Sequence, residues 1–205
     1  MRSGVEYIPQ EVDSGSWVFY SAVNLDYFAY QSNLVDVYLR APLVETIEFA
    51  FQGCEKLKEA HIVLNDESSL ASVHAHRMFT GCSSLEEVYF SSNKNVNQID
   101  DLFRGCSNLK TITWDFGTPA MMDNAFLGCY NLETFNGTTG LGTTMNFIDC
   151  SKLSYDSLIS IINRLMERSG GVELILHQEA YDRLTPEDIA VATNKGWSVV
   201  SANEY

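Results

Sequence analysis

The sequence predicts an α/β repeat fold, a solenoid with one stacked parallel β-sheet and with turns or short helices on the other side. Three observations predict it. A short motif, Phe-x-Gly-Cys-x-x-Leu, recurs along the chain, its copies are separated by a nearly constant distance, and most copies continue into a segment where apolar and polar residues alternate. Alternate residues of a strand share a face, so each copy supplies one strand with an apolar side. No single repeat can bury that side alone, and the repeats must therefore stack.

Five cysteines occupy the same place in five copies of the motif, namely Cys54, Cys82, Cys106, Cys129 and Cys150. Their successive spacings are 28, 24, 23 and 21 residues, close to the roughly 20 to 29 residues expected when a repeat contributes one strand and one turn or short helix. An earlier, degenerate copy begins at Phe28 and carries Tyr30 and Gln31 in place of Gly-Cys, and the last copy carries Asp149 in place of glycine. The sequence thus predicts six repeats over residues 28–153.

The motif resembles the leucine-rich repeats of the BspA-like group, whose signature is a Phe-x-Gly-Cys-x-x-Leu-x-x-Val/Ile segment. The resemblance covers residues 28–153 and extends into the strands, as in Leu85-x-x-Val88-x-Phe90. It implies a leucine-rich-repeat solenoid that serves surface attachment and recognition rather than catalysis. It also implies a setting, because such repeats are frequent in bacteria of the gut and oral cavity and in viruses of those bacteria.

Residues 1–27 lack the motif and are expected to form an N-terminal β cap, because an uncovered terminal coil would expose its core to water. Two short apolar segments, Val5 to Ile8 and Trp17 to Tyr20, flank a turn-rich stretch from Asp13 to Ser16. Strand-forming residues on both sides of a turn predict a capping hairpin.

Residues 154–205 also lack the motif and predict a C-terminal α/β cap with the order helix, strand, helix, strand. Ser154 suits the N-cap of the first helix, and Thr185, followed by a proline and acids, suits that of the second. The expected elements are a helix from about Tyr155 to Met166, a strand from Val172 to Leu176, a helix over 185–196 and a strand over 196–200. Residues Leu184 to Trp197 also resemble a Leu-Thr-x-Glu-x-Ile-Ala-x-Ala-x-x-Lys-Gly-Trp ending that follows such repeats in surface and virus-associated proteins.

Composition excludes two classes of partner. The 205 residues are 45% hydrophobic, enough for a sizeable core, yet no stretch approaches the roughly 18 to 20 apolar residues of a membrane span, so no membrane insertion is expected. The net charge is −14, and the 13 Lys and Arg residues are dispersed, which argues against a nucleic-acid partner. The segment from Met1 to Pro9 lacks the roughly seven or more consecutive apolar residues of a signal peptide, so we expect no signal peptide in the chain as it stands. We therefore expect an extracellular or cell-surface protein matured from a longer one, or a component of a virion.

Catalytic, cofactor and metal motifs find little support. The number of cysteines is odd, and each cysteine occupies the same position in its repeat. We therefore expect five reduced, buried thiols and neither disulfides nor zinc. The nearest metal constellation is His74-x-His76 with Asp66 and Glu67 nearby in sequence, and we expect a polar loop there. Asp100 and its neighbour are expected to begin a helical turn rather than hold calcium. The sequence predicts no enzyme, cofactor or metal.

The outward residues of the stacked strands are the predicted ligand-binding residues. They form two columns, the first of Asp36, Glu59, Glu87, Thr111 and Thr134, and the second of Tyr38, His61, Tyr89, Thr113 and Asn136. Repeat proteins commonly bind along such surfaces, and tyrosine offers both a flat ring and a hydroxyl. We expect a protein or glycan partner at a bacterial or host surface. Two alternatives remain: a structural decoration protein that binds other virion proteins, and a carbohydrate-active enzyme that uses the acidic residues of this face.

Overall fold

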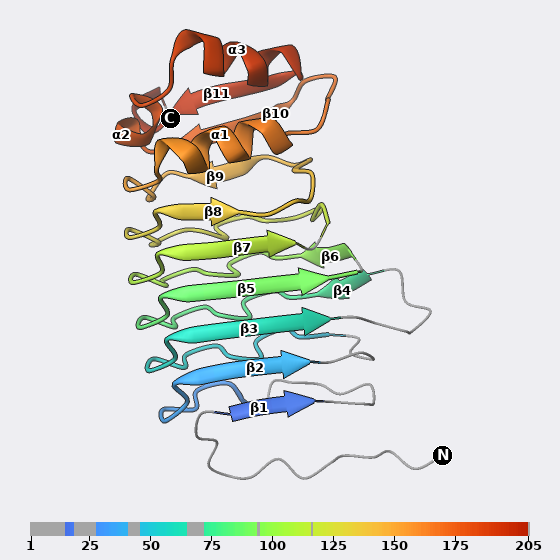
Figure 1. Ribbon diagram of the computed structural model, residues 1–205, viewed down its shortest axis with the longest axis vertical. Coiled ribbons are helices and arrows are strands. Elements are labelled where there is room, and N and C mark those ends of the chain that lie inside the picture. Colours follow the sequence, from blue (N-terminus) through green and yellow to red (C-terminus); the bar gives the residue numbers. More distant parts are fainter. Residues whose placement is uncertain are drawn as a thin grey trace.

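The strands of successive repeats lie side by side along the long axis of the molecule (Figure 1). The computed structural model describes residues 15–18, 28–40, 46–64, 72–93, 95–115 and 117–204. The largest sheet is parallel and has the order β1-β2-β3-β5-β7-β8, with β1 at Gly15–Val18, β2 at Asp36–Arg40, β3 at Glu59–Leu64, β5 at Glu87–Ser92, β7 at Thr111–Asp115 and β8 at Thr134–Asn136. Each repeat forms one coil of this stack, and the chain is an α/β repeat fold.

The strands form where apolar and polar residues alternate, as the sequence predicts. In β3, Ala60, Ile62 and Leu64 are buried while the intervening residues face outward. The phenylalanines that open the motif stack behind the sheet with nearly parallel rings. The centroids of Phe79 and Phe103 lie 5.5 Å apart with an interplanar angle of 6°. A continuous apolar core therefore runs through the coils and holds the strands in register.

The five cysteines lie in this core. Each of the first four donates its thiol hydrogen to the carbonyl of the phenylalanine in the preceding coil, as Cys54 does to Phe28 at 3.0 Å and Cys106 to Phe79 at 3.1 Å. All five are buried, free thiols. Burial raises the pKa of Cys54 to about 11 and the pKa of Cys82 well above its ordinary value. The repetition of the motif thus places a thiol in each coil, where it fills the core and donates a hydrogen bond to a backbone carbonyl.

We expect the native chain to resist thiol reagents, because a buried, protonated thiol is a poor nucleophile. Treatment with iodoacetamide at neutral pH should modify none of the five thiols in the folded protein and all five in guanidinium, as counted by intact mass. A chain that loses thiols to disulfides would instead show fewer than five sites after denaturation without reductant.

Two departures from the motif have structural roles at the first and last coils. Tyr30 stands where other copies have glycine, adopts the same left-handed backbone with φ of 60°, and lays its ring against Gly53. In the last copy, Asp149 uses its carboxylate to accept a hydrogen bond from the Gly128 amide at 2.7 Å. In the middle coils, a backbone carbonyl of the next coil accepts this bond, as Leu127 does from Gly105. Both substituted residues therefore contact the motif glycine of an adjoining coil, Tyr30 with Gly53 and Asp149 with Gly128.

The side opposite the main sheet differs from the prediction of turns and short helices alone. It carries a second parallel sheet, formed by β4 at Ser72–His74 and β6 at Asn95–Gln98. Isolated bridges extend this pairing to Thr46 and Met121 in the flanking coils. Among the described coils the rest of this side is built from turns. Because backbone groups there face their equivalents one coil away, short ladders form even without a strong strand pattern.

At the N-terminal end, β1 joins the main sheet. Gly15–Val18 pairs in parallel with β2, in register with residues from Val37 to Arg40. The expectation that Gly15 and Ser16 belong to a turn is thus wrong, because both lie in this strand. The other strand of the predicted hairpin, Val5 to Ile8, lies outside the described residues.

At the C-terminal end, helix α1 (Tyr155–Arg164) takes the place of the next strand beside β8. Ser154 accepts a hydrogen bond from the Ser157 amide and is the N-cap, as predicted. The buried Ser157 hydroxyl accepts a bond from the Phe135 amide at 3.1 Å and donates one to the Glu133 carbonyl at 3.0 Å. These bonds satisfy backbone groups of β8 that would otherwise lie at an open sheet edge.

A third parallel sheet closes the last coils. Its order is β11-β10-β9, with β9 at Met145–Phe147, β10 at Val172–Leu176 and β11 at Trp197–Ser201. Helices α2 (Gln178–Tyr181) and α3 (Pro186–Asn194) precede β11, and a 3-10 helix at Ala202–Glu204 follows it. Thr185 and Asp188 form a capping box at the start of α3. β9 and α2 were not predicted, because each is too short to show a clear periodicity.

Candidate ligand-binding face

The main sheet aligns the predicted ligand-binding residues into two rows across its outer face. Pairing between neighbouring strands places Asp36 beside Glu59, Glu59 beside Glu87, and the two threonines of this column beyond them. The same register forms the second row, which consists of Tyr38, His61, Tyr89, Thr113 and Asn136. The predicted columns are thus present in the structure, whereas ligand binding by these residues stays a prediction.

The first three members of the second row form a stack of rings, here termed the aromatic row. The ring centroids of Tyr38 and His61 lie 5.6 Å apart, and those of His61 and Tyr89 lie 4.4 Å apart, with interplanar angles of 24° and 26°. Tyr38 is 48% exposed and Tyr89 is 36% exposed. Large rings of this exposure are available to a ligand, while their mutual stacking restricts the rotation of each ring.

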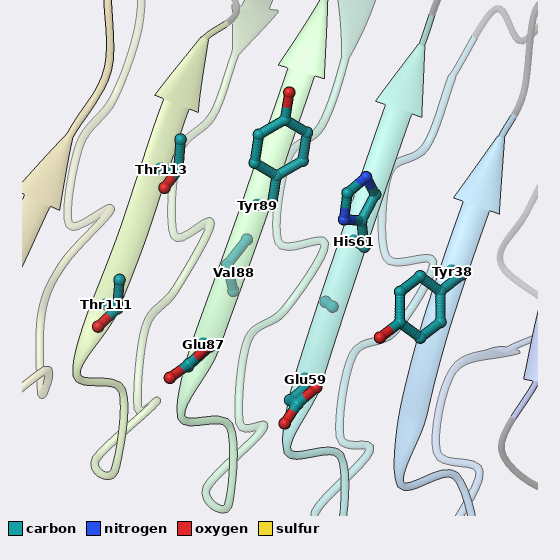
Figure 2. A pocket seen from close by; sticks show the side chains of 9 residues that line it. Tyr38, Glu59, His61, Glu87, Val88, Tyr89, Thr111 and Thr113 are labelled. Carbon is teal, nitrogen blue, oxygen red and sulfur yellow. The ribbon is translucent and has the colours of Figure 1, made fainter.

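Two carboxylates lie beside the aromatic row, nearer the starts of their strands (Figure 2). Glu59 and Glu87 are exposed, and their α-carbons are partners in the β3–β5 register. Paired strands lie about 4.8 Å apart, so the two like charges are near neighbours. The position results from the repeat itself, because both residues directly follow the Leu-x position of their own motifs.

The aromatic row and the carboxylates surround a shallow pocket of about 220 Å³. Seven of the ten predicted residues line it, and the full lining is Tyr38, Glu59, Ala60, His61, Glu87, Val88, Tyr89, Thr111 and Thr113. Asp36, Thr134 and Asn136 do not line it. Ala60 and Val88 also form part of the lining, although the alternation of their strands places both on the buried side, in agreement with their low exposure. No sequence signal distinguishes such floor residues, since a small or branched residue suits a buried strand position in any case.

One ion pair borders the pocket. The Lys110 ammonium lies 2.6 Å from a carboxylate oxygen of Glu86. The hydrogen bond to Lys110 and its charge hold the pKa of Glu86 below the usual range, and Glu86 in turn raises the pKa of Lys110. Lys110 thus has a carboxylate partner outside the pocket lining, and the charge of the pocket residue Glu87 contributes to its raised pKa as well.

The predicted metal candidates are engaged in other contacts. The Nδ1 atom of His74 lies 2.9 Å from the side-chain oxygen of Gln98. His76 lies 4.0 Å from an Asp100 oxygen and meets the Phe49 ring edge to face. Asp66 and Glu67 fall outside the described residues. Within the described ranges, no three His, Cys, Asp or Glu side chains are placed to hold a metal ion.

Asp100 and Asp101 are adjacent in the sequence, but their side chains make different contacts. Asp100 accepts a bond from the Asp123 amide at 3.0 Å, whereas the buried Asp101 accepts one from Arg77 Nε at 3.1 Å and pairs with Arg104 at 3.6 Å. Residues 100–105 form turns and Asp101 has a left-handed φ of 55°, so the helical turn expected to begin at this acidic pair is not found. The absence of calcium binding stays a prediction. The side chains of Asp100 and Asp101 tie adjacent coils together and do not face the pocket.

Comparison with known families identifies the repeats. The profile described as "BspA type Leucine rich repeat region" matches residues 21–154 in six copies. No curated protein and no solved structure gives a significant match to the chain. Within the described residues, the structure contains no helix with the length and apolar character needed to cross a membrane.

Proposed function

We propose, from the premise that the chain belongs to the BspA-type leucine-rich-repeat family, that it is a non-catalytic adhesion or protein-interaction module. In this proposal it binds a protein or glycan through the outer face of its main sheet. The family is typically non-catalytic, and its members are often exposed at surfaces. The observation that carries the proposal is the aromatic row, whose exposed rings border a pocket on an otherwise polar face.

The physical basis is preorganisation. Each ring of the aromatic row lies on a strand that is hydrogen-bonded to neighbours on both sides, above a continuous apolar core. Little backbone ordering is then needed on binding, and a rigid ring loses few rotamers, so more of the contact energy is retained as affinity. The hydroxyls of Tyr38 and Tyr89 add directional hydrogen bonds. A surface of this kind suits recognition of an extended polymer lying across the strands.

The setting we propose is a bacterial cell surface or a bacteriophage particle. The family resemblance supports this setting, and the acidic charge of −14 argues against a nucleic-acid partner there. The second candidate within this setting is a decoration protein whose partner is another protein of the virion. Attachment and decoration make different predictions about what the isolated chain binds.

The test is binding of the purified chain to intact bacteria and to panels of bacterial and host glycans. We expect the Tyr38→Ala/Tyr89→Ala variant to bind about tenfold or more weakly, because exposed aromatic anchors commonly contribute about 2 kcal/mol to an interface. Tyr130→Ala is the control, since Tyr130 is 57% exposed but does not line the pocket. Circular dichroism establishes that the variants fold.

Three results would contradict the adhesion proposal. Equal binding by the double variant and the parent would show that the aromatic row is not used. Binding to a purified virion protein, without binding to cells or glycans, would favour decoration. Turnover of a carbohydrate that is abolished by Glu59→Gln or Glu87→Gln would favour the enzyme.

A further inference from the structure

We infer that the pocket on the strand face takes a cationic side chain, an arginine or lysine presented by an extended basic segment of a partner protein. The inference rests on the proposed function and makes it more specific, because it names the chemistry of the ligand.

The pocket is acidic and lacks an internal counter-charge. Its lining contains two carboxylates, Glu59 and Glu87, and neither a lysine nor an arginine. Among the described residues, no ion pair or side-chain hydrogen bond engages either carboxylate. Lys110 is hydrogen-bonded to Glu86, and the charge of Glu87 acts on it as well. Both pocket carboxylates are exposed and are therefore accessible to a cation supplied from outside.

The arrangement of the two carboxylates is itself unfavourable in the unbound protein. Glu59 and Glu87 are direct cross-strand partners, and like charges in such positions destabilise a sheet. A pair of opposite charges at these two positions would instead stabilise the sheet. A cation bound between the two carboxylates removes the repulsion and replaces it with attraction, so this part of the binding energy depends on the ligand's charge.

The aromatic row fits the remainder of such a side chain. It lies two residues further along the strands than the carboxylates (Figure 2), a distance of about 6.6 Å at the rise of a parallel strand. A long basic side chain can lay its apolar stem or guanidinium plane against Tyr89 or Tyr38 while its charged head reaches Glu59 and Glu87. Arginine fits best, because its planar fork bonds carboxylates at two points.

A protein segment accounts for the rest of the face better than a cationic sugar does. An amino sugar carries its amine directly on the ring, so a ring stacked on the aromatic row holds the amine away from the carboxylate row. A peptide backbone can instead continue toward Thr111 and Thr113, whose hydroxyls donate and accept hydrogen bonds. The pocket thus presents negative charge at the two glutamates and neutral hydrogen-bonding groups at the two threonines.

The probe is an acetylated and amidated peptide of alternating glycine and arginine, compared with the same peptide containing neutral citrulline. Binding is measured by calorimetry at about 150 mM salt, where long-range attraction is largely screened. We expect the citrulline peptide to bind at least about tenfold more weakly, since a charge-assisted bond contributes about 1.5 to 3 kcal/mol. The Glu59→Gln/Glu87→Gln variant should lose the same preference.

The matched control is Glu55→Gln/Glu167→Gln. It removes the same two charges from exposed positions that do not line the pocket, and we expect its affinity for the arginine peptide to change less than about twofold. An oligomer of glucosamine and its neutral N-acetylated form are measured with the same proteins. They separate a cationic glycan from a cationic peptide.

Four outcomes overturn the inference, and they separate its failure from that of the proposed function. Equal losses in both glutamine variants would show general charge attraction. Tighter binding of the glucosamine oligomer would reject the protein partner. Binding of neutral glycans that depends on Tyr38 and Tyr89 but not on Glu59 and Glu87 would reject the cation and leave the proposed function standing. Absence of binding to every probe and to cells would reject both.

Discussion

Replacing Phe103 by alanine is expected to lower the free energy of unfolding by about 3–5 kcal/mol, the usual cost of removing a fully buried aromatic ring. Phe103 is 0% exposed and stacks between Phe79 at 5.5 Å and Phe126 at 5.9 Å. The cavity left by the ring would open in the middle of the phenylalanine stack. Because each coil is stabilised through its neighbours, both adjoining interfaces lose contacts.

Urea unfolding followed by circular dichroism measures this loss. The matched control is Phe49→Ala, the same substitution at a partly exposed ring that contacts His76 and lies outside the stack. We expect this variant to lose about 1 kcal/mol. Similar losses for the two variants would contradict the view that the buried phenylalanine stack contributes more to the stability of the central coils than a partly exposed ring does.

Replacing Gly196 by alanine is expected to lower the free energy of unfolding by about 2–5 kcal/mol, from two separate causes. Gly196 follows helix α3 with φ of 83°, and an alanine there pays about 1–2 kcal/mol for the left-handed backbone. An added β-carbon would also collide with the carbonyl oxygen of Arg168. That carbonyl belongs to backbone, so relief requires movement of the connection between α1 and β10 and costs a further 1–3 kcal/mol, roughly the cost of overpacking.

The control for the second cause is Gly171→Ala. Gly171 has φ of 75°, and its added β-carbon would meet nothing within 4 Å. The two variants share the backbone cost, so the difference between their unfolding free energies isolates the collision with Arg168. Thermal and urea unfolding of both proteins provide that difference. If Gly171→Ala proves as destabilising as Gly196→Ala, the collision contributes nothing and the packing around the last strand is looser than the structure shows.

The prediction for Phe103 bears on the binding face, because the strands of that face are held in place by the core behind them. Tyr38, His61 and Tyr89 project from strands whose opposite sides are the buried residues Leu39, Ile62 and Phe90 and their neighbours. A core variant that loosens the stack should therefore weaken ligand binding together with stability. The tyrosine and glutamate variants should weaken binding without lowering stability, since their side chains are exposed. This separation distinguishes a binding role from a structural one.

Much of the main sheet could be predicted from the sequence. The pairing of Glu59 with Glu87 and of His61 with Tyr89 follows from counting residues after the motif, because equivalent residues of adjacent coils must align in a parallel stack. The burial of the five cysteines and the N-caps at Ser154 and Thr185 follow from equally local rules. Because the same pattern occurs in several copies of the motif, each copy supports the prediction made from the others.

The sequence by itself determined what is periodic: the coil length, the inward and outward positions of each strand, and the two rows of outward residues. Only the tertiary structure decided the distances between the rings of the aromatic row, the pocket floor at Ala60 and Val88, and the sheets beyond the main one. It also decided that α1, through Ser157, completes the edge of β8, and that β9 pairs with β10. Periodicity encodes contacts that every repeat makes with the next. Contacts made once, between segments that share no pattern, depend on packing and backbone hydrogen bonds that arise only when the chain is folded.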